Sequence, residues 1–325
     1  MRIGITYDLR DDYLARGFDP EETAEFDKAE TIDAIHDAIS RLGHTPIRIG
    51  SVMDLVPRLA SGERWDLVFN IAEGLYGLGR EALVPALLDA YRIPYVFSDP
   101  LVMAVTLHKG IAKTILRGMG IPTPDFAVVE SLGRMPEIRI PLPLFVKPLA
   151  EGTGKGITPA SRIEDYAALE KACADILKRY RQPALVERYM PGREFTVGII
   201  GTGDTAQAIG AMEVIVKESD DVYSYHRKEH WETLVSYELA KGREAEDCIA
   251  IALQAWRGLG CRDAGRIDLK MDEKHTPHFL EVNPLPGLHP THSDLPILAG
   301  LCGMDFPELI KRILESSMRR MESAG

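Results

Sequence analysis

Cysteine is scarce in this chain and is not spaced to build a site. The four cysteines, Cys173, Cys248, Cys261 and Cys302, are scattered along 325 residues and form no CxxC pair. A disulfide framework and a cysteine-rich zinc site are therefore not expected. Scattered single thiols are typical of a reducing compartment, so we expect buried, reduced cysteines and a cytoplasmic location.

Long apolar runs and an excess of positive charge are also missing. No apolar run approaches the roughly 18–20 residues that cross a bilayer. Residues 1–8 enter a strand pattern after one arginine, so we expect neither a membrane span nor a signal peptide. Lys and Arg number 38 against 49 Asp and Glu, and the net charge of -11 argues against a non-specific nucleic-acid binder. Neither a membrane nor a nucleic acid is expected as a partner.

What is present divides into an α/β part and a mixed α+β part. Up to about residue 100 strand and helix patterns alternate, which indicates βαβ units and a parallel sheet. The expected strands are 2–8, 45–50, 66–72 and 93–99, and the expected helices are 20–44 and 80–91. Antiparallel strands are expected within 183–201 and at 206–216, and further helices at 107–120, 163–180, 245–260 and 306–320. We expect three domains, at 1–100, 101–185 and 186–325.

The stretch GRIDLKMDEKHTPHFLEVNP has the pattern of a β-hairpin. Polar and apolar residues alternate on both sides of a turn at 273–276, so Asp268 is expected directly opposite Glu281. The same register places Arg266 opposite Asn283. Like charges in facing positions destabilise a sheet, and a cation such as Mg²⁺, which takes carboxylate and amide oxygens, would offset their repulsion. A solvated polar face with a register shifted by one is the alternative.

Two further segments carry groups suited to a nucleotide. In FVKPLAEGTGKG a strand delivers Lys147 to a loop where Thr153 and Gly154 stand among other glycines. Backbone N–H groups of such a loop can close around phosphate oxygens, although the Walker pattern GxxxxGK[ST] is absent and a flexible surface loop is the alternative. In LVERYMPGREFTVGI, Glu187 and Glu194 flank a Pro-Gly turn, where they could accept from ribose or from adenine-linked donors, or remain solvated.

Two histidine-containing segments have more than one interpretation. YSYHRKEHWE places His226 and His230 four residues apart, but it offers no third ligand, so zinc is not expected; Lys228 could instead reach a phosphate. NPLPGLHPTHSDLP follows the hairpin and carries His292 and Ser293. It is either a substrate loop or a rigid proline-rich connection.

The order of these segments resembles the ATP-grasp superfamily, and most closely the D-alanine–D-alanine ligases. The resemblance runs along nearly the whole chain, and its strongest parts are REFTVGIIG, GLGCRDAGRIDLKMD and FLEVNPLPG. It implies an ATP-grasp fold with subdomains at 101–185 and 186–325, preceded by a Rossmann-like parallel-sheet domain at 1–100. It also implies an ATP-dependent carboxylate–amine ligase for amino acids that forms an acyl phosphate, uses ATP and two Mg²⁺ ions (or Mn²⁺ in their place), and is a homodimer.

The resemblance also implies roles for individual residues. Arg266 and Lys228 are the expected catalytic residues, Arg266 at the reacting centre and Lys228 on a loop that closes over the nucleotide. The other matches are Lys109, Lys147, Thr153 and Gly154 at the phosphates, Glu187, Arg188, Tyr189 and Met190 at adenine, Glu194 at ribose, and Asp268, Glu281 and Asn283 at the metals. Backbone N–H groups near Gly287 would assist Arg266 in stabilising a tetrahedral oxyanion.

The amino-acid subsites depart from the family pattern. Glu73 lies roughly where the family has a histidine, and the loop for the second substrate's carboxylate is one residue longer, with His292 or Ser293 as its binding residue. The family's acidic contact to the first ammonium group has no clear counterpart, although a glutamate among residues 21–25 could serve. We therefore expect D-alanyl-D-alanine as the default product. A ligase for another amino acid or a specialised metabolite, or a non-catalytic ATP sensor, are the alternatives.

Overall fold

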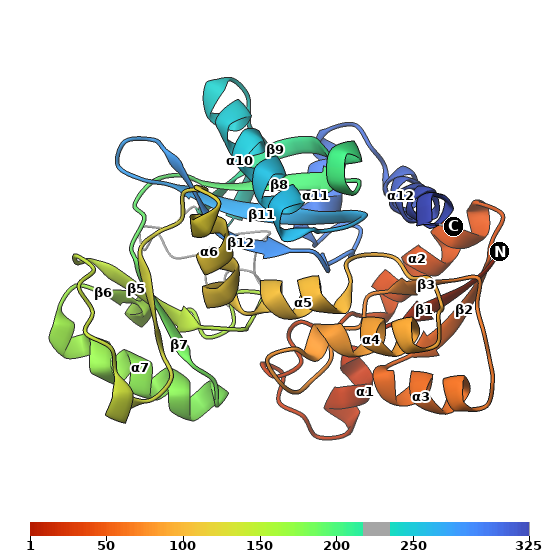
Figure 1. Ribbon diagram of the computed structural model, residues 1–325, viewed down its shortest axis with the longest axis horizontal. Coiled ribbons are helices and arrows are strands. Elements are labelled where there is room, and N and C mark those ends of the chain that lie inside the picture. The colour runs from red at the N-terminus through yellow and green to blue at the C-terminus, as the bar shows by residue number, and fades with distance from the viewer. Residues whose placement is uncertain (217–234, 325) are drawn as a thin grey trace.

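The computed structural model describes residues 1–216 and 235–324, which fold into three sheets with flanking helices (Figure 1). Lys228, His226 and His230 lie outside the described residues, so the structure does not bear on their expected roles. Within the described ranges, none of the helices combines the length and apolarity that a bilayer span requires.

The N-terminal module is built on a parallel sheet, as the sequence predicts. Its strands lie in the order β2-β1-β3. Its elements are β1 (Arg2–Thr6), α1 (Arg10–Ala15), α2 (Ala29–Arg41), β2 (Thr45–Gly50), α3 (Val52–Ala60), β3 (Leu67–Asn70), the short 3-10 helix η1 (Arg80–Ala82) and α4 (Leu83–Ala90). The side chains of β3 are all buried, which is typical of a parallel strand covered on both faces.

The strand expected at 93–99 is wrong. The segment contributes a single bridge, between Val68 and Tyr95. Beyond that bridge the backbone leaves the sheet, because the N–H of Phe97 donates to the carboxylate of Asp263 at 2.9 Å instead of to a neighbouring strand.

The helix expected at 20–44 is shorter, because α2 begins only at Ala29. Asp27 forms an isolated bridge with Leu9, and this extended backbone separates α2 from the turns that precede it. The N–H of Asp27 also donates to the carbonyl of Asp8 at 3.1 Å. As a result the acidic turns before α2 are held against the strand end of the module, where they reach the site.

The central part is a four-stranded antiparallel sheet in the order β4-β7-β5-β6. Its elements are α5 (Pro100–Leu107), α6 (Lys109–Gly118), β4 (Phe126–Val129), η2 (Leu132–Arg134), β5 (Leu144–Pro148), η3 (Pro159–Ser161), β6 (Arg162–Ile163), α7 (Tyr166–Tyr180) and β7 (Ala184–Arg188). Buried residues of α7 pack on one face of this sheet. The glycine-rich loop leaves β5 toward the centre of the molecule.

The C-terminal part contains a five-stranded antiparallel sheet in the order β10-β9-β8-β11-β12. Its elements are β8 (Glu194–Ile200), η4 (Gly203–Thr205), β9 (Gln207–Val216), β10 (Val235–Leu239), α10 (Arg243–Leu259), β11 (Ala264–Met271), β12 (Pro277–Asn283), α11 (Asp294–Leu301) and α12 (Phe306–Ala324). Trp256 of α10 is fully buried against this sheet.

The helix α12 lies beside α2 of the N-terminal module (Figure 1). Leu309 and Ile313 of α12 are fully buried in the same core cluster as Ile5, Ile35 and Phe69. Segments from the two ends of the described chain therefore share one core, which fixes the N-terminal module relative to the C-terminal sheet.

Candidate active site

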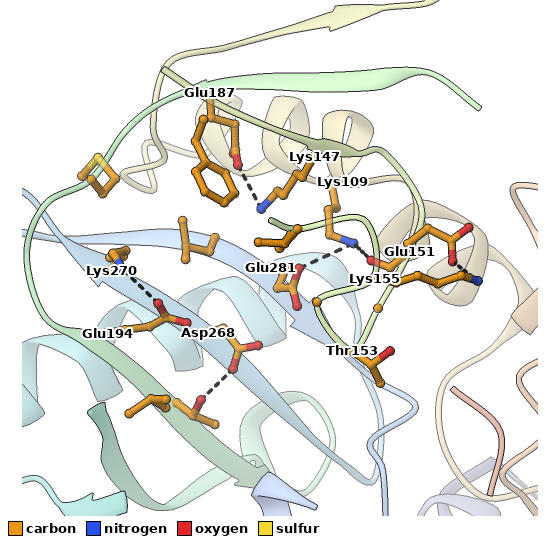
Figure 2. A pocket seen from close by; sticks show the side chains of 18 of the residues that line it. Lys109, Lys147, Glu151, Thr153, Lys155, Glu187, Glu194, Asp268, Lys270 and Glu281 are labelled. Carbon is orange, nitrogen blue, oxygen red and sulfur yellow. Dashed lines mark hydrogen bonds and ion pairs between the residues drawn. The ribbon is translucent and has the colours of Figure 1, made fainter. Parts of the chain in front are cut away.

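Two adjoining cavities hold the expected site residues, the first of them shown in Figure 2. The first cavity is lined by Lys109, Lys147, Thr153, Gly154, Glu187, Arg188, Tyr189, Met190, Glu194, Arg266, Asp268 and Glu281. The second is lined by Glu73, Asn283, Gly287, His292 and Ser293. Both cavities include Lys109, Thr153, Arg266 and Glu281. Groups bound in the two cavities would meet at these four residues.

The glycine-rich loop after β5 is folded for close backbone approach. Thr153, Gly154 and Gly156 have φ angles of 49°, 69° and 76°. A β-carbon at Gly156 would lie 2.5 Å from Cγ of Pro148, so only glycine fits there. The hydroxyl of Thr153 is buried and has no hydrogen-bond partner in the described part of the chain. A phosphate oxygen would satisfy it, which supports a phosphate loop rather than a free surface loop.

Two lysines surround a buried carboxylate at one end of the first cavity. Glu187 is 2% exposed, and its carboxylate lies 2.6 Å from Nζ of Lys113 and 2.9 Å from Nζ of Lys147. Burial alone would raise the pKa of Glu187, but the two lysines outweigh it and lower that pKa. Burial lowers the pKa of Lys113 to about 8. Glu187 thus holds both lysines, and a contact to adenine would add to these ion pairs.

The turn between β7 and β8 forms the wall expected to face the base and the ribose. Arg188 is tied to the hairpin turn through Glu273, with both carboxylate oxygens 2.9 Å from its guanidinium. The ring of Tyr189 is buried at the cavity wall. Nζ of Lys270 lies 2.9 Å from the carboxylate of Glu194, as Figure 2 shows, and Lys270 thereby fixes the expected ribose contact.

The β11–β12 hairpin confirms the predicted pairing at its site end. Asp268 pairs with Glu281, and Arg266 pairs with Asn283. The register shifts by one residue beyond Asp268, so the turn expected at 273–276 is too short. The alternative of a register shifted by one along the whole hairpin is therefore wrong. The acidic pair and the arginine lie together.

Charges at Arg266 are closely balanced. Its guanidinium donates to the carboxylate of Asp268, and its Nε lies 3.6 Å from Asp294. Thr196 donates to the other oxygen of Asp268 at 2.9 Å. Burial raises the pKa of Asp268 to about 6; Arg266 lowers it and Glu281 raises it further. Burial would lower the pKa of Arg266, but Asp268 and Asp294 outweigh it, so Arg266 keeps its charge.

The donor set beside Arg266 suits a divalent cation shared with phosphates. Across residues 1–216 and 235–324, no three His, Cys, Asp or Glu side chains are grouped to hold a metal by themselves. Asp268 and Glu281 face each other, however, and Asn283 adds an amide group next to them. Mg²⁺ typically takes one or two carboxylates from a protein and completes its shell with phosphate and water, so these three residues fit it.

One wall of the second cavity is the loop before α11. Ser293 precedes α11, and its Oγ accepts from the N–H of His289 at 2.9 Å. A β-carbon at Gly287 would lie 2.8 Å from that Oγ, so glycine lets the loop fold closely. The ring centroids of His289 and His292 are 4.3 Å apart. Hydroxyl, imidazole and backbone N–H groups on this wall are suited to a carboxylate.

The facing wall comes from the N-terminal module and is acidic. It carries Glu73 together with Asp27 and Glu81, which the sequence analysis did not single out. Burial raises the pKa of Glu81 to about 7, with Arg80 opposing the shift. Burial also raises the pKa of Asp27 to about 7 and that of Glu73 well above its ordinary value.

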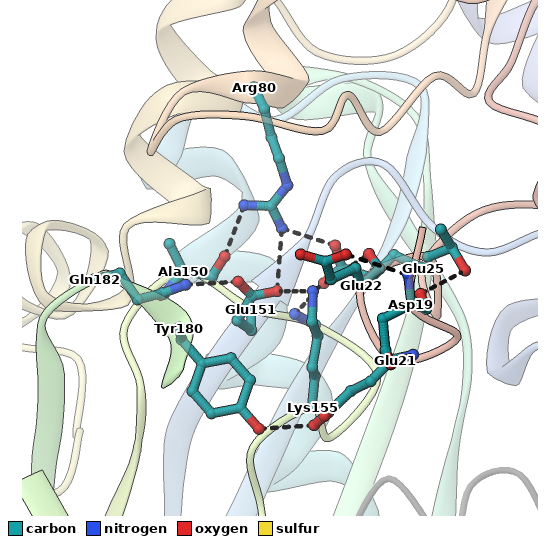
Figure 3. Close-up of polar contacts among 12 residues, drawn as sticks. Asp19, Glu21, Glu22, Glu25, Arg80, Ala150, Glu151, Lys155, Tyr180 and Gln182 are labelled. Carbon is teal, nitrogen blue, oxygen red and sulfur yellow. Dashed lines mark hydrogen bonds and ion pairs between the residues drawn. The ribbon is translucent and has the colours of Figure 1, made fainter. Parts of the chain in front are cut away.

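Arg80 joins this wall to the glycine-rich loop (Figure 3). It is 7% exposed, lies 2.7 Å from the carboxylate of Glu25 and donates to the carbonyl of Ala150 at 2.8 Å. The N–H of Gly152 also donates to Glu25. Burial alone would raise the pKa of Glu25, but Arg80 and Lys155 outweigh it and lower that pKa. Glu25 lines the second cavity but already has a cationic partner.

Some functional residues were missed from the sequence. Lys113 follows Lys109 by four residues on α6, so both lie on one helix face whose other members are buried. That spacing was an available signal. Glu81 and Thr196 offered none, because they reach the site through contacts between distant segments.

Comparison with known proteins agrees with this geometry. Residues 115–315 match the family described as D-ala D-ala ligase C-terminus. An uncharacterized protein, y4sG, of Sinorhizobium fredii is 33% identical over 80% of this chain and 76% of its own length. The D-alanine–D-alanine ligase of Bordetella avium is 32% identical over 84% of both chains.

The fold is also that of solved ligases. The crystal structure of D-alanine–D-alanine ligase from Bacillus anthracis complexed with ATP covers 100% of both chains with a TM-score of 0.74 at 23% identity. At that identity the likeness shows the fold, and the sequence relatives show the family. This chain belongs to the D-alanine–D-alanine ligase family and is a ligase with the ATP-grasp fold.

Proposed function

We propose that this ligase uses ATP to activate the carboxylate of one amino acid as an acyl phosphate, and then joins it to the amine of a second. The observation that carries the proposal is the meeting of the two cavities at Lys109, Thr153, Arg266 and Glu281. One cavity has the buried cations and glycine-rich loop that a triphosphate needs. The other has groups for amino-acid carboxylates and ammonium groups.

Lys109, Lys147 and the loop at Thr153 would bind the phosphates. Nζ of Lys109 lies 3.5 Å from the carboxylate of Glu281 and donates to the carbonyl of Glu151 at 2.5 Å, so it is held at the junction of the cavities. A positive charge fixed there offsets the charge on a phosphoryl group during transfer. The base and ribose would then lie along Arg188–Met190 and Glu194.

Asp268, Glu281 and Asn283 would hold Mg²⁺. When bound, the ion would neutralise phosphate charge and align the transferred group. The raised pKa of Asp268, which burial and Glu281 cause together, supports this assignment, because two facing carboxylates without a cation are costly.

Arg266 would stabilise the oxyanion that forms when the amine attacks the acyl carbon. Its pairs with Asp268 and Asp294 fix the guanidinium at the cavity junction without neutralising the whole fork of donors. The Gly287 loop, with Ser293 and His292, would orient the second amino acid through its carboxylate. Phosphate then leaves and the amide remains.

The test is Mg·ATP turnover with single and paired amino acids, D-alanine included, with products identified by mass. We expect ADP, phosphate and an amide in equal amounts. Arg266→Ala should keep nucleotide binding and lose amide formation by about 10²-fold or more, the usual scale for an oxyanion donor. ADP without amide would indicate a phosphotransferase, and ATP binding without any turnover would indicate a sensor; either result contradicts the proposal.

A cytoplasmic location and a homodimer also remain proposals. The free cysteines, three of them buried, support a reducing compartment. Sedimentation of the purified protein would decide between monomer and dimer.

A further inference from the structure

The second cavity carries an excess of negative charge. Seven carboxylates line it, against four lysine or arginine side chains. Four of the seven have a cationic partner. Glu25 lies 2.7 Å from Arg80 and Glu151 lies 2.8 Å from Lys155. The other two are at the cavity junction, Glu281 at 3.5 Å from Lys109 and Asp294 at 3.6 Å from Arg266.

The other three carboxylates, Asp27, Glu73 and Glu81, have no such partner. In the described part of the chain, the side chains of Glu73 and Glu81 form no hydrogen bond and no ion pair, and Asp27 interacts with the hydroxyl of Thr31. All three are half-buried at the cavity wall. Burial without a cation disfavours their charged forms, and this raises the pKa of each.

The excess matters because of what the reaction brings into the cavity. Each simple amino acid is a zwitterion with one ammonium group and one carboxylate, so two of them add no net charge. The negative charge of the acidic wall would remain uncompensated with both in place. Desolvating unpaired carboxylates is costly, and a ligand cation is the group that offsets this cost.

The position of the acidic wall indicates which part of the ligand it meets. Glu81 interacts electrostatically with Lys109 and Glu281 at the cavity junction, and Glu73 with Glu25 and Asp27 farther from it. The two unpaired glutamates therefore extend from the reacting centre along the wall of the N-terminal module. They face the loop whose Ser293 and His292 suit a carboxylate.

We propose that the second cavity takes an amino acid with a cationic side chain, and that Glu73 and Glu81 hold its additional ammonium or guanidinium group. The inference rests on the proposed ligase function and names the substrate class of that site. A diamino acid would pair as a point charge, and a guanidinium could bind carboxylate oxygens in bidentate fashion. Neutral amino acids of similar size would leave both glutamates unpaired.

The first experiment compares amino acids as substrates of the full chain. ADP release and product mass are measured with alanine and 2-aminobutyrate as neutral substrates, and with 2,3-diaminopropionate, ornithine, lysine and arginine as cationic ones, each as both enantiomers. We expect kcat/KM for the best cationic substrate to exceed that for the best neutral one by about tenfold or more. Equal or better use of neutral amino acids overturns the inference while leaving the ligase function standing.

Variants assign the preference to the two glutamates. Glu73→Gln and Glu81→Gln should each raise KM for the cationic substrate by about 30-fold or more, the scale of losing one partner of a buried charge pair, with little effect on a neutral substrate. Glu30→Gln is the matched control, because Glu30 is exposed, lies outside the lining of the cavity and carries the same charge. Equal losses for both substrate types would overturn the role of the glutamates.

Binding provides a readout that does not depend on turnover. Calorimetry with the same amino acids, in the presence of a non-hydrolysable ATP analogue, should show tighter binding of cationic than neutral ligands to the wild type and a smaller difference in the Gln variants. Neutral ligands that bind as tightly as cationic ones overturn the inference even if no pair is turned over. Absence of ADP release with every pair, by contrast, would count against the ligase proposal itself.

Discussion

At the scale of single residues, the site depends on charged groups that are buried together. Glu187 lies between Lys113 and Lys147, and removing either cation would leave a larger share of its charge unbalanced. Breaking a buried ion pair costs about 3–5 kcal/mol, whereas an exposed pair contributes about 0–1 kcal/mol. Burial therefore decides which lysines matter.

Lys113→Met should lower the free energy of unfolding by about 3 kcal/mol, since Glu187 loses its nearest cation. We also expect weaker ATP binding, because Lys147 would be drawn more firmly to Glu187 and less available to phosphate. Chemical denaturation and calorimetry measure the two effects. Lys171→Met is the control, because Lys171 pairs with Asp175 on the surface and should change stability by about 0.5 kcal/mol or less. A stable, tightly binding Lys113→Met protein would contradict this role.

At the scale of elements, the glycine-rich loop combines two separate constraints. Gly156 has a positive φ and also touches Pro148, whereas Gly62 has a positive φ with open space around it. The two positions therefore separate backbone strain from close packing.

Gly156→Ala should raise the KM for ATP by about tenfold or more, because the added methyl group displaces the loop from Pro148 as well as straining φ. Gly62→Ala should cost about 1 kcal/mol of stability through φ alone and leave that KM unchanged. Steady-state kinetics with a thermal melt of each variant distinguishes the effects. Equal KM values for the two variants would mean that loop geometry does not set ATP binding.

The hairpin shows what a sequence pattern can and cannot predict. Alternation placed Asp268 opposite Glu281 correctly, because one face of the strand must be buried and the period is two. The turn end was wrong: Met271, not Asp272, pairs with Pro277, since a shift after Asp268 inserts an extra residue that alternation alone does not reveal. Local periodicity therefore predicted the functional pair and missed the irregularity beside it.

Long-range contacts were the other limit. The fold class, the parallel sheet and the grouping of nucleotide residues followed from element order and from the family resemblance. Glu81 and Arg80 gave no local signal, because their neighbours at the site come from the turns before α2 and from the loop after β5. The acidic wall of the second cavity became visible only when these distant segments were seen together.

At the scale of the whole molecule, the acidic wall makes stability depend on pH. Burial raises the pKa of Glu81 from 4.5 to about 7, so the folded chain binds this proton more tightly than the unfolded chain does. The contribution of Glu81 to stability is therefore favourable below about pH 4.5 and is lost as the pH rises towards 7.

Glu81→Gln should remove this dependence. We expect its gain in unfolding free energy over the wild type to grow between pH 5 and pH 7.5, by on the order of 1–3 kcal/mol, and then to level off. Melting temperatures across that range measure it, with Glu30→Gln as a control that should show no trend. A difference independent of pH would mean that Glu81 titrates normally in the folded protein.

The packing of α12 on the N-terminal module has a consequence for how the protein is made. The module is synthesised first, but Leu309 and Ile313 complete the core that holds Ile5 and Ile35. Until α12 has left the ribosome, that apolar face lacks its cover, and the acidic wall and the phosphate loop have no fixed relative position. The nascent chain is thus a client for chaperones late in its synthesis, and catalytic competence arises in a single final step of assembly.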